Sequence, residues 1–161
     1  ILTEVVKISS DLNAEINFLV CGGGSLYSKF QESTRDLKVR YLGWTKNLTD
    51  FYSSIDLLIL TSDNEGTPLS LIQAGMSGLP VVSTRVGSVP EVVLDGVTGM
   101  ITSLDVQEIA DALEKLAKSA ELRVQMGAAA QEFTLSNFGV DRLVHDHEQL
   151  YKKLLANRAK S

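Results

Sequence analysis

The sequence predicts an α/β protein built on an open, doubly wound (Rossmann-like) parallel sheet with a helical C-terminal tail. Apolar runs rich in β-branched residues mark five strands, the last of them weaker: Ile16–Cys21, Val39–Leu42, Asp56–Thr61, Pro80–Thr84 and Gly99–Thr102. These runs are nearly continuous rather than alternating, which is typical of parallel strands covered on both faces. They start about 20 residues apart, the repeat of a strand, a helix and two short loops.

Helical patterns separate these runs and then replace them. We expect helices between the strands at Leu26–Ser33, Asn47–Ser54, Pro68–Ser77 and Ser88–Leu94, and after the last strand at Asp105–Ser119, Glu121–Phe133 and Val140–Ala156. Ile1, Leu2, Val5 and Val6 recur at helical spacing, so the chain is expected to be a fragment that opens inside a helix. No linker or repeat interrupts the pattern, which predicts a single domain over residues 1–161, mainly helical over 105–161.

Composition and charge restrict the partners. Of the 161 residues 44% are apolar and 22% charged, values close to the average for folded globular proteins. The net charge of −5 disfavours nucleic acid and anionic membranes, since both need a basic patch. The one cysteine, Cys21, excludes an internal disulfide framework and is typical of a reducing compartment, so we expect a cytoplasmic protein. The chain shows neither a signal-peptide pattern nor an apolar stretch near the roughly 20 residues of a membrane span.

The segment Glu65–Met76 carries the densest chemical information, because it follows a predicted strand at the edge where ligands bind. Thr67 is expected to cap a helix and Pro68 to occupy its first position. Leu69 and Ser70 would then hold the exposed amides of the first turn. Those amides and the positive end of the helix dipole form a site for a phosphate group.

Two side chains flank this predicted anion site. Gln73 lies one turn beyond Leu69 and Ser70, and helical side chains lean toward the N-terminus, so its amide can reach hydroxyls beside a bound phosphate. Glu65 precedes the cap, where its carboxylate could hold further hydroxyls. This combination fits a nucleotide sugar. Simple helix capping, with a solvated Glu65 and a solvent-facing Gln73, is the alternative that local chemistry leaves open.

Several ordered blocks resemble the large retaining glycosyltransferase family of the GT-B type. Residues 65–73, with the small-residue turn and Pro-Val-Val strand that follow, are similar to its donor-site signature, and residues 86–99 resemble the next block. Upstream, residues 18–24 and 41–44 resemble the ends of the family's second and third strands. The resemblance runs from about Ile16 to Phe138 and implies one half of a GT-B fold that uses a nucleotide diphosphate sugar as donor.

The resemblance implies a role for each matched residue. Glu65 would be the catalytic residue at the donor sugar, and Gln73, where the family usually has Glu, would bind the ribose. Gln keeps the length and an acceptor oxygen but loses the charge. The backbone amides of Leu69 and Ser70 would hold the distal phosphate, and the loop of Gly43, Trp44 and Thr45 would lie beside the nucleobase. The other expected donor-binding positions are Gly66, Thr67, Pro68 and Gly22, the last in a turn lining the cleft. Trp44 could instead be a partly buried aromatic plug.

The resemblance also implies missing parts. The first strand of this domain, which the family's phosphate-binding cations follow, is absent from the chain, as is the N-terminal domain that holds the acceptor. Lys46 and Arg85 are the nearest cations and are expected to be solvated surface charges. The isolated chain should therefore bind nucleotides weakly and transfer no sugar. Any peripheral membrane association would come only from the missing domain.

Other signals are weak. His145 and His147 point to different sides of a helix, so we expect no metal and no cofactor beyond the sugar nucleotide substrate. The glycines after the first predicted strand do not fit the dinucleotide fingerprint, whose third glycine would fall at Tyr27. Two alternatives to sugar transfer remain: a nucleotide-sugar epimerase on the same scaffold, and a non-catalytic nucleotide-sugar-binding domain.

Overall fold

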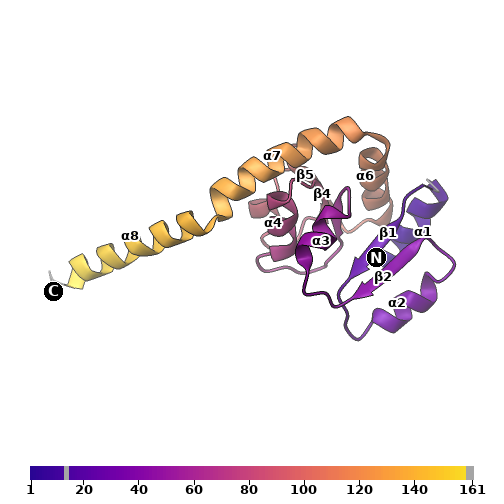
Figure 1. Ribbon diagram of the computed structural model, residues 1–161, viewed down its shortest axis with the longest axis horizontal. Coiled ribbons are helices and arrows are strands. Elements are labelled where there is room, and N and C mark those ends of the chain that lie inside the picture. Colours follow the sequence, from indigo (N-terminus) through magenta and orange to yellow (C-terminus); the bar gives the residue numbers. More distant parts are fainter. Residues whose placement is uncertain (13–14, 159–161) are drawn as a thin grey trace.

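A computed structural model describes residues 1–12 and 15–158 of the chain. The elements follow in the order α1 (Leu2–Leu12), β1 (Phe18–Cys21), α2 (Tyr27–Ser33), β2 (Val39–Gly43), α3 (Leu48–Ser53), β3 (Leu58–Leu60), α4 (Leu69–Met76), β4 (Val81–Thr84), α5 (Val89–Val92), β5 (Gly99–Thr102), α6 (Val106–Lys118), α7 (Ala120–Phe138) and α8 (Val140–Arg158). Strands alternate with helices as far as β5, and three helices follow (Figure 1). The predicted fold class and helical tail are confirmed.

All strand pairs are parallel, but the strands form two sheets where we expected one. β1 pairs with β2, with Phe18 opposite Val39. β4 lies between β3 and β5, with Val81 opposite both Leu58 and Gly99. Every residue of β4 is buried, as expected of a central parallel strand covered on both faces. Pairing between distant strands does not follow from the local pattern that predicts each strand, so the sequence did not reveal the division.

Two apolar clusters cover opposite faces of the sheets. One gathers side chains of α3, α4, α5, β4 and β5, including Phe51, Leu71 and Val81. The other joins α1 and α6 to β1 and β4, through Val5 and Ile109 among others. Successive residues of β4, Val81 and Val82, enter different clusters, because neighbouring side chains of a strand point to opposite faces.

Local capping chemistry sets several helix ends where the sequence predicts them. The side chains of Asn47, Asp105 and Ser119 each accept a backbone N–H from the first turn of the helix that follows. α7, in contrast, continues five residues beyond the predicted end at Phe133. There the Thr134 hydroxyl donates to the Ala130 carbonyl and the Asn137 amide to the Phe133 carbonyl, so both polar side chains are satisfied within the helix.

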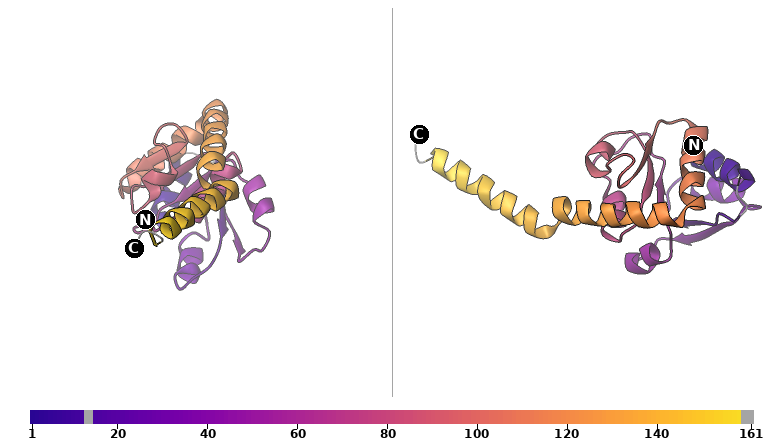
Figure 2. Two further views of the ribbon diagram at one scale, coloured as in Figure 1. Left: turned by 90° about the vertical axis from the view of Figure 1, so that its left-hand side faces the viewer. Right: turned by 90° about the horizontal axis from the view of Figure 1, so that it is seen from above.

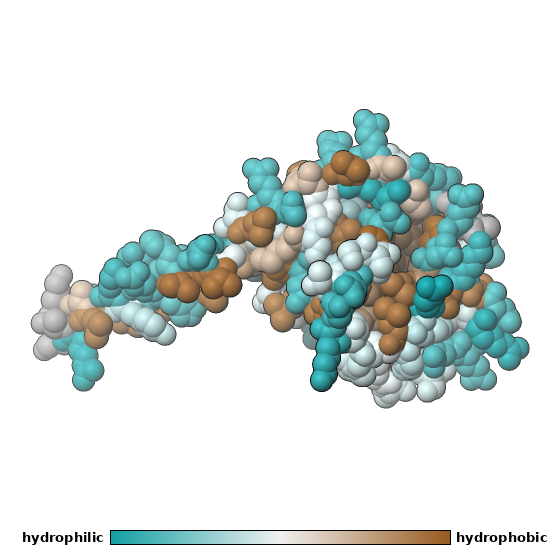
Figure 3. Space-filling view, in the orientation of Figure 1, coloured by the Kyte–Doolittle hydropathy of each residue, from teal (hydrophilic) through white to brown (hydrophobic). Residues whose placement is uncertain are grey.

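The last helix projects from the body of the molecule (Figures 1 and 2). None of its described residues is buried, and it exposes Leu143, Val144, Leu150 and Leu154 among charged neighbours (Figure 3). Over the described part of the chain, no helix combines the length and the apolar character that crossing a bilayer requires.

Candidate functional site

The loops after β1 and β2 meet at the carboxyl ends of these strands. Gly22 and Gly43 have φ angles of 119° and 63°, in the region that side chains disfavour, and the Gly22 N–H donates to the Gly43 carbonyl at 2.8 Å. The predicted turn at Gly22 is therefore present, and the structure places it directly beside Gly43.

Trp44 lies on the outer surface of this pair of loops. Its side chain is 86% exposed, so the interpretation as a buried plug is wrong. The indole Nε1 lies 2.8 Å from the point that a Cβ on Gly23 would occupy, which means that the ring rests on the backbone of Gly23. The neighbouring Thr45 hydroxyl accepts the Asn47 N–H at 3.2 Å and so belongs to the turn that starts α3.

Glu65 is held at the end of β3 by two contacts. The Ser62 hydroxyl donates to its carboxylate at 2.6 Å. A Cβ on Gly87 would lie 1.7 Å from the Glu65 carbonyl oxygen, so only a glycine lets the loop after β4 approach this closely. The hydroxyl of Thr84, the last residue of β4, donates to the Ser62 carbonyl at 2.5 Å and so ties the loop after β3 to β4. Glu65 is half-buried, and its position is fixed by β3 and β4 together.

The start of α4 differs by one residue from the prediction. Pro68, not Thr67, is the N-cap, with φ −76° and ψ 89°, and no side chain caps the helix. The Pro68 carbonyl accepts the N–H groups of Leu71 and Ile72 at 3.0 and 3.3 Å, so the helix begins at Leu69 and the Thr67 oxygen lies too early in the chain to cap it. A residue before proline is also held outside the helical conformation.

The two amides predicted to face an anion are open. Within residues 1–12 and 15–158, neither the Leu69 N–H nor the Ser70 N–H has a hydrogen-bond acceptor. Leu69 is 65% exposed and Ser70 half-buried, so the first turn of α4 lies at the surface of the molecule. An open first turn of this kind carries the positive end of the helix dipole and accepts an anion.

Gln73 is exposed on α4 and is held by a residue that the sequence did not single out. The Tyr52 hydroxyl of α3 donates to the Gln73 side-chain oxygen at 3.0 Å and lies 3.4 Å from the Ser70 carbonyl. Only 7% of Tyr52 is exposed. Burial raises the pKa of Tyr52 above its ordinary value of 10.0, and the nearby Cys21 thiol adds a smaller rise. Tyr52 and Gln73 are 21 positions apart, and no local pattern links them.

The side chains of Glu65 and Gln73 point to different neighbours. Gln73 borders a shallow hollow of about 390 Å³ between α3 and α4, whose other lining residues are Leu48, Thr49, Tyr52, Ser53, Met76 and Ser77. Glu65 is held instead by Ser62 and the loop after β4. The open amides of Leu69 and Ser70 lie between them in the chain. The structure therefore joins Gln73 to α3, and Glu65 to the ends of β3 and β4.

In the described part of the chain, the remaining candidates form no hydrogen bond or ion pair with Glu65, Leu69, Ser70 or Gln73. Arg85 forms a half-exposed ion pair with Asp95 at 2.9 Å, and Lys46 is exposed. His145 and His147 are exposed on α8. Among the described residues, no three His, Cys, Asp or Glu side chains gather where they could hold a metal ion.

Known proteins resemble this chain over most of its length. Residues 1–119 match the family described as glycosyl transferases group 1. The N-acetyl-alpha-D-glucosaminyl L-malate synthase of Bacillus anthracis is 29% identical over 160 residues, covering 96% of this chain and 42% of the relative. The D-inositol 3-phosphate glycosyltransferase of Corynebacterium diphtheriae is 35% identical over 136 residues, covering 78% of this chain and 32% of the relative. The chain thus spans less than half the length of these curated relatives.

A solved structure has the same fold. Anabaena HepE in complex with UDP and glucose superposes on 93% of this chain and 43% of its own, with a TM-score of 0.81 and 21% sequence identity. This likeness agrees with a Rossmann-like half of a larger fold. Since the family match covers residues 1–119, more than half of the chain, the chain belongs to the glycosyl transferases group 1 family.

Proposed function

We propose that this chain is the donor-binding part of a retaining glycosyltransferase that moves a sugar from a nucleotide diphosphate sugar to an acceptor hydroxyl. The observation that carries the proposal is the open first turn of α4, where the Leu69 and Ser70 amides have no acceptor among the described residues. The turn follows the Glu65 loop directly in the chain and precedes Gln73 by one helical turn. The HepE structure, which holds UDP and glucose, supports a donor of this class.

Each part of the site has a role in this proposal. The amides of Leu69 and Ser70 bind the distal phosphate and stabilise the negative charge that develops on it as the sugar leaves. Glu65 binds the sugar near the reacting carbon, and its hydrogen bond from Ser62 keeps the carboxylate in place. Gly22, Gly43, Trp44 and Thr45 border the nucleobase, with the exposed Trp44 ring free to stack on it.

Gln73 binds the ribose in this proposal, and Tyr52 determines how. The Tyr52 hydroxyl takes one of the two acceptor positions of the Gln73 carbonyl oxygen, so in this proposal the two donors of the amide NH₂ are the groups that face the ligand. An NH₂ group donates hydrogen bonds, and a ribose hydroxyl oxygen accepts them. Gln73 can therefore hold the ribose without the negative charge of the Glu that is usual in the resembling family.

The test is turnover by the longer protein of which we propose this chain is part. Glu65→Gln keeps the size of the side chain and removes its charge. We expect this change to lower kcat about a hundredfold, since the lost interaction acts mainly in the transition state, while calorimetric titration still detects UDP-glucose or GDP-mannose binding. Glu91→Gln on α5 is the matched control, because Glu91 is an exposed acid outside the site.

Three other outcomes would count against the proposal. Equal turnover of the Glu65→Gln and Glu91→Gln proteins would remove Glu65 from the site. Donor binding without any turnover by the unsubstituted protein would identify a non-catalytic binding domain, a function that Gln in place of Glu favours. Isomerisation of the free sugar nucleotide would identify an epimerase. For the chain of 161 residues by itself we expect weak nucleotide binding and no sugar transfer, because a half-site excludes water poorly.

A further inference from the structure

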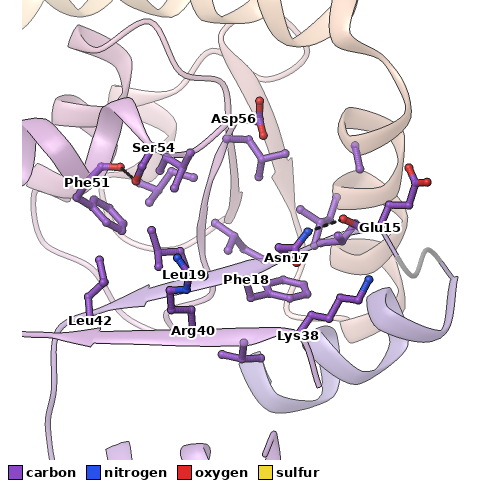
Figure 4. A pocket seen from close by; sticks show the side chains of 18 of the residues that line it. Glu15, Asn17, Phe18, Leu19, Lys38, Arg40, Leu42, Phe51, Ser54 and Asp56 are labelled. Carbon is purple, nitrogen blue, oxygen red and sulfur yellow. Dashed lines mark hydrogen bonds between the residues drawn. The ribbon is translucent and has the colours of Figure 1, made fainter. Parts of the chain in front are cut away.

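Two neighbouring aromatic residues of α3 serve different parts of the molecule. Phe51 lines the groove between β1 and β3 together with Ser54, whose hydroxyl donates to the Phe51 carbonyl at 2.8 Å (Figure 4). Tyr52 instead lines the hollow between α3 and α4, beside Gln73. The two rings meet edge to face, with their centroids 5.2 Å apart, and both are buried. Packing therefore holds the Tyr52 ring, and with it the position of its hydroxyl against α4.

The hydrogen of the Tyr52 hydroxyl has two acceptors within reach. The Gln73 side-chain oxygen lies 3.0 Å away and the Ser70 carbonyl 3.4 Å away. Since O–H···O bonds in proteins span about 2.5–3.0 Å, the Ser70 contact is weak and Gln73 is the acceptor. A buried tyrosine hydroxyl needs such a partner, because leaving it without one costs free energy. Burial also raises the pKa of Tyr52, which keeps the proton on the hydroxyl well above neutral pH.

This hydrogen bond fixes which end of the Gln73 amide is available. The oxygen and the NH₂ are the two branches of one planar group, so an oxygen held against Tyr52 directs the NH₂ away from α3. Gln73 is exposed, and its NH₂ meets no acceptor in the ranges 1–12 and 15–158. The Gln73 backbone carbonyl is occupied by the N–H and the hydroxyl of Ser77. Residue 73 therefore offers a ligand a pair of hydrogen-bond donors.

A glutamate at position 73 would offer a ligand the opposite polarity. A carboxylate only accepts hydrogen bonds, so the ligand would have to donate one. An amide NH₂ only donates, so the ligand must supply an acceptor. A hydroxyl satisfies both side chains, because it donates and accepts. An ether oxygen, which only accepts, and an ammonium group, which only donates, distinguish the two.

We infer that Tyr52 is a positioning residue that holds Gln73 as a hydrogen-bond donor, so that the nucleotide site selects an acceptor oxygen on the ribose. The inference rests on the proposed function, in which Gln73 binds the ribose, and adds the polarity of that contact. Tyr52 acts only through Gln73, since its own hydroxyl is engaged by the amide oxygen. A ribose hydroxyl that can no longer donate should still bind, whereas a group that cannot accept should be rejected.

The first measurement identifies the hydroxyl that Gln73 contacts. Calorimetry on the longer protein of which we propose this chain is part gives the affinity for UDP, or for GDP if it binds more tightly. The 2′-deoxy and 3′-deoxy forms of that nucleotide are then compared with it. Loss of the contacted hydroxyl should weaken binding about fivefold. The same loss should have no effect in Gln73→Ala, which lacks the amide.

Two analogues at the contacted position then test the polarity. The O-methyl analogue accepts a hydrogen bond and cannot donate one. The amino analogue, at a pH at which the amine is protonated, donates and cannot accept. The quantity compared is the ratio of the two affinities, each taken relative to the unmodified nucleotide at the same pH. A methyl group or a charge on the ligand then affects every protein variant alike.

We expect the unsubstituted protein to favour the O-methyl analogue. In Tyr52→Phe the freed amide can turn either end to the ligand, so the preference should fall at least about tenfold. In Gln73→Glu the preference should reverse in favour of the protonated amine, because a carboxylate has no hydrogen to donate to an ether oxygen. Tyr151→Phe, on the exposed α8, is the matched control and should leave the preference unchanged.

A preference that Tyr52→Phe leaves unchanged would overturn the inference, even if every affinity fell, because a merely structural role weakens all ligands equally. Tyr52→Phe keeps the buried ring. If that variant nevertheless does not fold, Gln73→Glu, at an exposed position, carries the test, and an unchanged preference there would overturn the inference.

Failure of the inference and failure of the proposed function give different results. If neither deoxy nucleotide depends on Gln73, residue 73 does not bind the ribose and the inference is wrong, while the turnover test of Glu65→Gln keeps its own outcome. If none of the nucleotides binds, the proposed function fails and the inference fails with it.

Discussion

Tyr52 has a larger part in the site than its place in the sequence indicates. It is buried between α3 and α4, bonds to Gln73, and lies near Cys21 at the end of β1. Tyr52 thus links α3, α4 and the end of β1 near the candidate site. Ionisation of its hydroxyl should therefore change the free energy of unfolding of the protein.

The pKa of Tyr52 predicts a loss of stability at alkaline pH. Because burial raises the pKa above 10.0 in the folded protein, the neutral phenol contributes stability that is fully present below pH 10.0 and is lost as the pH rises through the folded-state pKa. Urea unfolding from pH 8 to pH 11.5 should show a smaller alkaline decline for Tyr52→Phe than for the unsubstituted chain. Tyr151→Phe, on the exposed α8, is the control and should not alter the decline. Identical profiles for all three proteins would contradict the assignment.

Gly87 is the residue that lets the Glu65 loop close on β4. Its φ of 47° is disfavoured for any side chain, and a Cβ there would overlap the Glu65 carbonyl. Gly96 has a similar φ of 75° but open space around the Cβ position. Gly96→Ala should therefore lower the free energy of unfolding by about 1 kcal/mol, and Gly87→Ala by at least about 2 kcal/mol, since overpacking adds to the backbone term. Denaturant unfolding of the two variants measures the difference. Equal losses in the free energy of unfolding would show that the Glu65 loop can shift to make room for a Cβ at position 87.

At the scale of elements, α4 depends on its contact with α7. A Cβ on Gly75 of α4 would lie 2.5 Å from the Cγ2 methyl of Thr134 in α7. The Thr134 hydroxyl already donates to the Ala130 carbonyl, so the side chain cannot simply rotate away. The close approach of these two helices fixes the orientation of α4 and with it the Ser70 and Gln73 positions.

Gly75→Ala should destabilise the protein by about 1–3 kcal/mol through this overlap. Thr134→Ser removes the methyl and keeps the hydroxyl, so the double variant should regain most of the loss. The free energies of unfolding of the two single variants and the double variant form a complete cycle. Additive effects would show that the two residues do not meet.

The sequence predicted the elements better than their assembly, for physical reasons. Asn47, Asp105 and Ser119 cap their helices through bonds to residues three positions away, and such chemistry can be read locally. The open first turn of α4 was predicted in the same way, although the cap moved to Pro68. The bond between Tyr52 and Gln73 and the separation of β1 from β3 depend on tertiary packing, which no window of sequence contains.

For the molecule as a whole, α8 is the element with the least support. None of its described residues is buried, and it follows α7 away from the body (Figure 2). An isolated helix of this length is marginal in water, because most helical stability comes from packing. The fold of the body should therefore not require it.

A chain ending at Gly139 tests this independence. We expect its free energy of unfolding, followed through far-ultraviolet circular dichroism during urea denaturation, to stay within about 0.5 kcal/mol of that of the full chain. The truncation removes the ion pair of Arg142 with Asp146, which is half-exposed and contributes little. A loss above about 2 kcal/mol would show that α8 packs on the body in solution.

The half-buried position of Cys21 has a practical consequence. It is the one thiol of the 161 residues, and it immediately precedes the Gly22 turn at the end of β1. A maleimide dye attached there would sit at the proposed nucleotide edge without any engineered substitution. The native chain thus carries its own labelling handle for following ligand arrival by fluorescence.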